Sequence, residues 1–140
     1  MSINSNALAG TLLLGCLALA GEAMAACTGP ALNQAALVTA LTGNTVCAVR
    51  GADRWQELHQ AGGDLIDFKR GPSDRVDPSE KVGTWSITAN PSGNSASVVY
   101  NYGSGGTYTY SVRSNGGTSY SFCGVQNIDV VIKAGGGACP

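Results

Sequence analysis

The sequence predicts a small all-β protein, an up-and-down antiparallel meander barrel of about eight strands, stapled by disulfides. Three observations lead to this prediction. Alternating apolar segments follow one another from Val82 to Ile132, glycine-rich turns separate them, and four cysteines follow an apparent export signal. Strands that are joined by a short turn at nearly every step are well suited to curl and close into a barrel. A β-sandwich is the alternative fold.

The first 25 residues are typical of a secretory signal peptide. An apolar run from Ala7 to Ala20 precedes Ala23-Met24-Ala25, which forms a small-x-small cleavage site, although no Lys or Arg stands before the run. The run is shorter than the roughly 20 residues that a membrane span needs. An uncleaved N-terminal helix is the alternative. The chain is therefore predicted to be secreted or periplasmic, with residues 26–140 as one barrel domain and no membrane span.

A lipid anchor is a second alternative for the signal region. Leu13-Leu14-Gly15-Cys16 resembles the lipobox of bacterial lipoproteins. Lipidation of Cys16 would leave the apolar stretch from Leu17 to Ala20 on the mature protein. Soluble export is therefore the favoured prediction.

Charge gives no reason to expect a nucleic acid or an anionic membrane as a partner. The chain carries 8 basic and 9 acidic residues, and one of the acids, Glu22, lies in the predicted signal. A formally neutral domain lacks the positive field that such partners require.

The four cysteines of the predicted mature chain, Cys27, Cys47, Cys123 and Cys139, predict two disulfides. A closed barrel brings its first and last strands together. Cys47–Cys123 and Cys27–Cys139 are therefore the favoured pairs, while Cys27–Cys47 with Cys123–Cys139 stays open.

The N-terminal part predicts one helix and one strand. Apolar residues recur at helical spacing from Leu32 to Leu41, and Gly43-Asn44 follows as a stop signal. The apolar side of this helix predicts a packing face or lid, with a partner-binding helix as the alternative. The strand is predicted over Thr45–Val49.

A charged segment follows, from Arg50 to Lys81. Two strands are predicted in it, Arg54–Gln60 and Asp64–Arg70, because a glycine-containing turn joins two alternating runs. The polar and proline-containing stretch Gly71–Glu80 predicts the longest loop.

Five further strands are predicted in the last third of the chain from its alternating pattern. Their apolar and aromatic residues share one parity within each strand. They cover Trp85–Ala89, Val98–Tyr102, Tyr108–Val112, Tyr120–Phe122 and Ile128–Ile132.

The tripeptide Gly83-Thr84-Trp85, with this strand count, the early helix and the terminal cysteines, resembles the calycins, which include lipocalins and avidin-like barrels. The resemblance implies a barrel that holds a small ligand.

Aromatic residues are the candidate ligand-binding residues. If the tyrosine-bearing face points inward, the rings line a cavity in which hydroxyl groups orient a ligand. If it points outward, they form a cross-strand ladder on the surface, and plain core packing is the third alternative. The predicted set is Trp55, Phe68, Trp85, Tyr100, Tyr102, Tyr108, Tyr110 and Tyr120.

No catalytic site and no cofactor are predicted. His59, the one histidine, shares a strand face with Glu57 and Trp55, so an acid–base pair is the alternative to a structural role. No nucleophile motif accompanies it.

No metal site is predicted either. Asp74, Asp77 and Glu80 lie together in the long loop, but their spacing does not match a calcium-binding loop. The chain has no C-x-x-C pair to bind zinc.

The sequence therefore predicts an exported barrel that binds a small, largely apolar ligand, in a hollow interior of roughly a few hundred Å³. The alternative is a surface interaction protein (an inhibitor, an adhesin or a self-assembling subunit) that uses a Tyr-rich sheet face or edge.

Overall fold

The computed structural model describes residues 26–50, 53–67 and 80–140. The predicted signal residues, the predicted ligand-binding residue Phe68 and the loop residues Asp74 and Asp77 lie outside the described residues. The described chain holds one α-helix, α1 (Gln34–Leu41), one short 3-10 helix, η1 (Gly103–Gly105), and eight strands.

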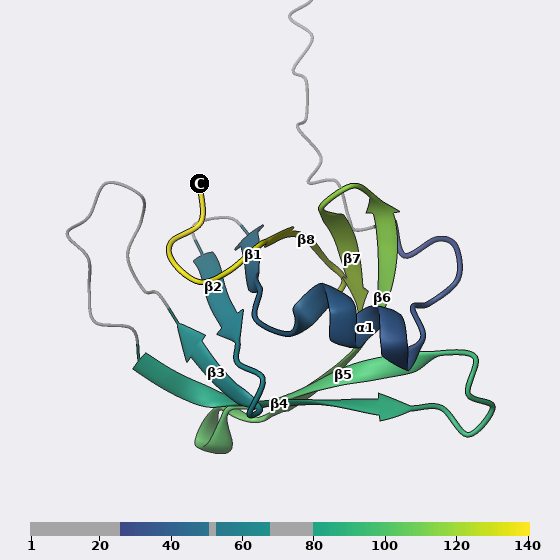
Figure 1. Ribbon diagram of the computed structural model, residues 1–140, viewed down its shortest axis with the longest axis horizontal. Coiled ribbons are helices and arrows are strands. Elements are labelled where there is room, and N and C mark those ends of the chain that lie inside the picture. The colour runs from purple at the N-terminus through teal and green to yellow at the C-terminus, as the bar shows by residue number, and fades with distance from the viewer. Residues whose placement is uncertain (1–25, 51–52, 68–79) are drawn as a thin grey trace, which may run out of the picture.

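The eight strands form a closed antiparallel barrel in which each pairs with the next along the chain and the last pairs with the first (Figure 1). This confirms the predicted fold class. The strands are β1 (Thr45–Arg50), β2 (Asp53–His59), β3 (Asp64–Asp67), β4 (Glu80–Ala89), β5 (Ala96–Asn101), β6 (Thr107–Gly116), β7 (Ser119–Cys123) and β8 (Ile128–Lys133).

Helix α1 begins two residues later than the apolar spacing predicted. The side chain of Asn33 caps it, accepting a hydrogen bond from the backbone N–H of Ala36 at 2.9 Å. Leu32 instead lies before the helix and bridges β5 and β6, because its N–H donates to the carbonyl of Val112 and its carbonyl accepts from the N–H of Ala96. The segment before the helix is thus tied to the barrel.

α1 closes one end of the barrel. Leu37 and Leu41 are both fully buried and belong to the core cluster, and the helix contacts β4 and β5. At its end, the N–H of Gly43 donates to the carbonyl of His59 at 2.8 Å. Figure 1 shows the helix crossing the ring of strands. The predicted packing face is confirmed.

The core fills the barrel from α1 toward the other end. Its members alternate along the strands, as side chains of one sheet face must. They are Val46, Ala48, Leu65, Trp85, Ala96, Val98, Tyr100, Val112, Phe122, Val130 and Ile132, together with Leu37 and Leu41 of α1.

The two predicted disulfides are present, but both favoured pairings were wrong. The bonds join Cys27 to Cys123 and Cys47 to Cys139, with Cα atoms 5.8 and 5.9 Å apart. Cys123 ends β7, and β8 lies between β7 and β1. Two strand spacings separate Cys123 from Cys47 by about 9.5 Å, beyond the reach of a disulfide. Each chain end therefore bonds to a separate strand.

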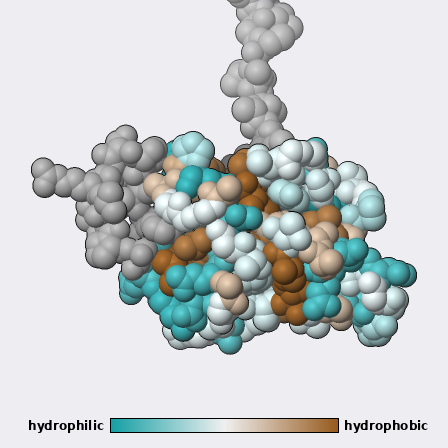
Figure 2. Space-filling view, in the orientation of Figure 1, coloured by the Kyte–Doolittle hydropathy of each residue, from teal (hydrophilic) through white to brown (hydrophobic). Residues whose placement is uncertain are grey.

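On the face shown in Figure 2, hydrophobic residues form separate patches among hydrophilic ones. In the part of the chain that the structure describes, no helix is long and apolar enough to cross a membrane.

A candidate ligand site at the open end of the barrel

The barrel half farther from α1 holds a cavity of about 60 Å³ that is partly open to solvent. A water molecule needs roughly 10–15 Å³ by this measure, so the cavity has room for about four or five heavy atoms. It is therefore smaller than the few hundred Å³ expected for an enclosed ligand. Its walls are Val46, Ala48, Trp55, Glu57, Tyr100, Tyr102, Tyr110, Phe122, Ile128 and Val130.

Glu57 brings a carboxylate into this cavity. It lies on β2 between Trp55 and His59, and the alternation of the strand turns all three inward. Only 8% of Glu57 is exposed, and its two oxygens accept hydrogen bonds from the Tyr102 hydroxyl at 2.8 and 3.0 Å. A charged group is thus held where water has little access.

The surroundings of Glu57 disfavour its charged form. Burial and the facing carboxylate of Asp67, its partner across β2 and β3, raise the pKa of Glu57 to about 7, although the hydrogen bond from Tyr102 acts in the opposite direction. Near neutral pH, Glu57 is therefore poised between its two protonation states.

His59 forms a second buried polar pair, with Tyr100. Its Nδ1 lies 3.0 Å from the carbonyl oxygen of Glu57, which can only accept, so Nδ1 carries the proton. Its Nε2 is then an acceptor, and the Tyr100 hydroxyl donates to it at 2.8 Å. Burial lowers the pKa of His59 to about 4, which keeps the ring neutral at neutral pH.

This geometry favours a structural role for His59 over an acid–base pair with Glu57. The histidine is fully buried, and each of the two side chains has a different tyrosine as its partner. Tyr100 on β5 contacts His59, and Tyr102, just after β5, contacts Glu57, so two polar contacts link β2 to this part of the chain.

The cavity tyrosines pack as one aromatic cluster around Tyr100. Its ring centroid lies 6.2 Å from that of Tyr102, 6.0 Å from that of Tyr110 and 6.3 Å from that of Phe122. Burial raises the pKa of all three tyrosines, and the charge of Glu57 adds to each rise. Their hydroxyl groups are therefore protonated donors.

Four of the eight predicted ligand-binding residues line the cavity, namely Trp55, Tyr100, Tyr102 and Tyr110. Tyr108 packs its ring against Tyr102 but is 46% exposed, and its hydroxyl donates to the Gly105 carbonyl. Tyr120 packs against the core and lines a surface groove beside α1 instead.

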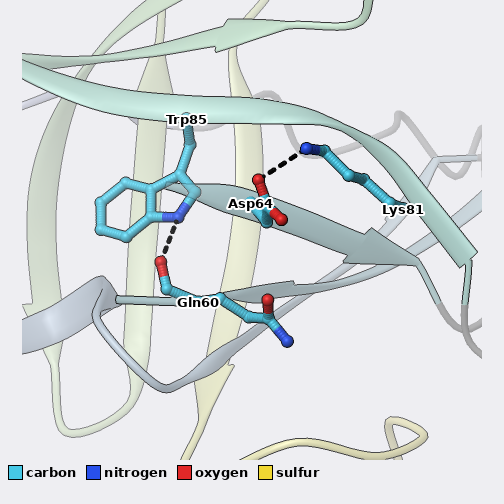
Figure 3. A network of polar contacts seen from close by, with 4 residues as sticks. All are labelled: Gln60, Asp64, Lys81 and Trp85. Carbon is cyan, nitrogen blue, oxygen red and sulfur yellow. Dashed lines mark hydrogen bonds and ion pairs between the residues drawn. The ribbon is translucent and has the colours of Figure 1, made fainter. Parts of the chain in front are cut away.

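Trp85 lies deeper, toward the α1 end. Its indole N–H donates to the carbonyl of Gln60 at 2.9 Å (Figure 3). Its ring meets that of His59 edge-on, with the ring centroids 5.0 Å apart. On the same strand, Lys81 forms an ion pair with Asp64 at 2.7 Å. Trp85 therefore supports the core and does not line the cavity.

Glu57 is the charged lining residue that the predicted set missed. Its place between Trp55 and His59 in an alternating strand already put it on the same face as both. The other lining residues absent from that set are Val46, Ala48, Phe122, Ile128 and Val130.

A larger groove, of about 340 Å³, lies along β1, β2 and β8 beside the C-terminal segment. Val49 and Val131, which are 61% and 44% exposed, lie in it next to the Cys47–Cys139 disulfide. Its charged lining residues are Arg54 and Asp129.

No protein-family model matches the chain, and neither a curated protein nor a solved structure matches it.

Proposed function

We propose that this protein is a binding protein that holds one compact group of a small ligand at the open end of its barrel. The cavity between Trp55, Glu57, Tyr102 and Tyr110 is the observation that carries the proposal. A concave site with apolar walls and a few converging polar groups is the usual form of a ligand pocket. Only part of the ligand enters, because the cavity has room for few atoms.

The proposal narrows the ligand that the sequence predicted. The described core residues pack between α1 and the aromatic cluster, so we do not place a large apolar molecule there. The rest of the ligand therefore lies outside the cavity. Binding of this kind would require neither catalysis nor a cofactor. We therefore also propose that the protein is not an enzyme, and that it is exported.

A surface interaction protein remains the second proposal. Among the described residues, Tyr108 is the one tyrosine that is largely exposed, and the closed barrel leaves no free sheet edge. A protein partner would instead bind at the groove that contains Val49 on β1 and Val131 on β8, whose apolar side chains are exposed.

Kinship with the calycins is likewise a proposal. It is supported by the eight-strand meander, the helix that closes one end and the buried Trp85 after Gly83.

A fragment screen observed by amide NMR tests the binding site. The expected result is that some fragments shift the signals of Trp55, Tyr102 and Tyr110. An Ala48→Leu variant, in which the larger side chain occupies the cavity, is expected to abolish these shifts. Val49→Leu, on the outer face of the same strand, is the matched control and is expected to leave them unchanged. Fragments that shift only residues of the outer groove would contradict the proposal.

A further inference from the structure

The cavity at the open end contains a buried carboxylate, that of Glu57, and among the described residues no cation forms an ion pair with it. Within the described part of the chain, the Glu57 carboxylate accepts its hydrogen bonds from a neutral tyrosine hydroxyl, that of Tyr102. The residue that faces Glu57 across the sheet, Asp67, is itself an acid. A buried charge is costly unless an opposite charge compensates it.

The other walls of the cavity favour a cation as well. Rings of Trp55, Tyr100, Tyr102 and Tyr110 surround the space next to Glu57. The face of an aromatic ring carries negative potential and attracts a cation that lies over it, most strongly for tryptophan and when water is excluded. Aromatic walls and a carboxylate therefore select for the same kind of group.

We propose that the group held at the open end is a methylated ammonium, whose positive charge lies against the Glu57 carboxylate and between the aromatic rings. This inference rests on the proposed function of the site and names its ligand class.

The hydrogen-bonding groups explain why methylation matters. The Tyr102 hydroxyl donates to Glu57 and the Tyr100 hydroxyl to His59, so the acceptors in the cavity are the Glu57 carboxylate and the few oxygen atoms of the tyrosines. A guanidinium has five N–H donors and would leave several of them unpaired, at a cost for each. A trimethylammonium has no N–H donor, and its four or five heavy atoms match the volume of about 60 Å³.

Choline and its uncharged isostere, in which a carbon replaces the nitrogen, are the probes that test the charge. Isothermal titration of the mature protein is expected to give an affinity for choline about tenfold or more above that for the isostere. This comparison uses the unaltered protein, so it does not depend on the folding of a variant. Equal binding of the two probes at the cavity would overturn the cation proposal while leaving the binding site intact.

Glu57→Gln tests the carboxylate. Glutamine has the same shape and can still accept from Tyr102, so the loss of affinity for choline, again about tenfold or more, would report the charge. Asp64→Asn is the matched control, because it removes a carboxylate from the outer surface and is expected to leave choline binding unchanged. Unchanged binding in Glu57→Gln would contradict the proposal.

The pH dependence gives a third readout. The charge of choline is fixed, so titration reports the protein alone. Burial raises the pKa of Glu57 to about 7, and affinity for choline is therefore expected to increase between about pH 6 and pH 8. The other groups near it are Asp67 on β3, the cavity tyrosines, which stay neutral in this range, and Arg50 at the end of β1.

Failure of the proposed function looks different from failure of the cation proposal. If no fragment of any charge shifts the residues of the cavity, both are overturned. If neutral fragments bind there and choline does not, only the cation proposal is overturned.

Discussion

Glu57 and His59, two residues apart on β2, respond to burial in opposite directions. The pKa of Glu57 rises from 4.5 to about 7, and that of His59 falls from 6.5 to about 4. In both cases burial disfavours the charged form. The interior of the barrel therefore favours two neutral groups at mildly acidic pH.

The two shifts have opposite effects on stability. Glu57 keeps a proton in the folded protein that the unfolded chain releases above pH 4.5, so its stabilising contribution is lost as the pH rises to about 7. His59 resists a proton that the unfolded chain accepts below pH 6.5, so its contribution is lost as the pH falls to about 4. Between about pH 4 and pH 7, the pH dependence of stability that Glu57 causes largely cancels the one that His59 causes.

We predict that Glu57→Gln removes the loss of stability that Glu57 causes as the pH rises above 4.5. The free energy of unfolding of the variant, relative to the original protein, is expected to increase by something on the order of 3 kcal/mol as the pH rises from 4.5 to 7. Urea unfolding at a series of pH values measures the difference, in which the effects of unaltered groups cancel. Parallel stability profiles of the two proteins would contradict the shift of Glu57.

At the scale of elements, Gly83 of β4 lies close to the backbone at the end of β5. A Cβ atom on Gly83 would lie 2.4 Å from the carbonyl oxygen of Asn101 and 3.1 Å from its carbonyl carbon. Both are backbone atoms, which cannot rotate away as the end of a side chain can. The spacing of the two strands therefore requires glycine at position 83. Asn101, whose backbone lies there, directly precedes Tyr102, which contacts Glu57.

We predict that Gly83→Ala destabilises the protein by about 2 kcal/mol, because it forces β4 away from β5. Gly62→Ala is the matched control: no atom lies within 4 Å of its added Cβ, and its backbone is not left-handed. The control is expected to change the free energy of unfolding by less than about 0.5 kcal/mol. Similar values for the two variants would show that the strands can separate at Gly83.

The strands and the helix were predictable because they depend on local alternation and spacing. Residue parity placed Tyr100 and Tyr110 on one face of the sheet but did not decide whether that face points inward. Parity also does not give the position of a residue along the barrel axis. It therefore could not predict that Tyr108 is far more exposed than Tyr100. The volume of the cavity depends on how side chains from several strands fill the space between them, and no single segment carries that information.

At the scale of the whole molecule, the two disulfides hold the ends of the described chain. They close loops with sequence separations of 96 and 92 residues. Their pairing could not be read from the sequence, because it depends on which strand separates Cys47 from Cys123. The general rule that first and last strands meet was right, but Cys123 lies on the strand before the last.

We predict that Cys47→Ser with Cys139→Ser and Cys27→Ser with Cys123→Ser each lower the free energy of unfolding by about 4 kcal/mol, because the two loops are nearly equal in length. Denaturant unfolding measures the loss. Each double variant is expected to contain no free thiol among its remaining two mature cysteines.

Peptide mapping supplies the control on pairing. Cleavage at Lys and Arg leaves Cys27 and Cys47 in one peptide, so the cut must fall between them, for example at the leucines of α1. A fragment in which Cys47 is joined to Cys123 would contradict the observed pairs.

The way the ends are fastened also sets how the molecule would respond to a pulling force. From Cys27 the covalent path crosses directly to Cys123 and then follows the chain to Cys139. That path contains about 16 residues and extends to about 55 Å, whereas an unbridged chain of about 112 residues would reach about 390 Å. Under tension in an oxidising medium, the barrel would act as a short tether whose strands from β1 to β7 cannot be drawn out.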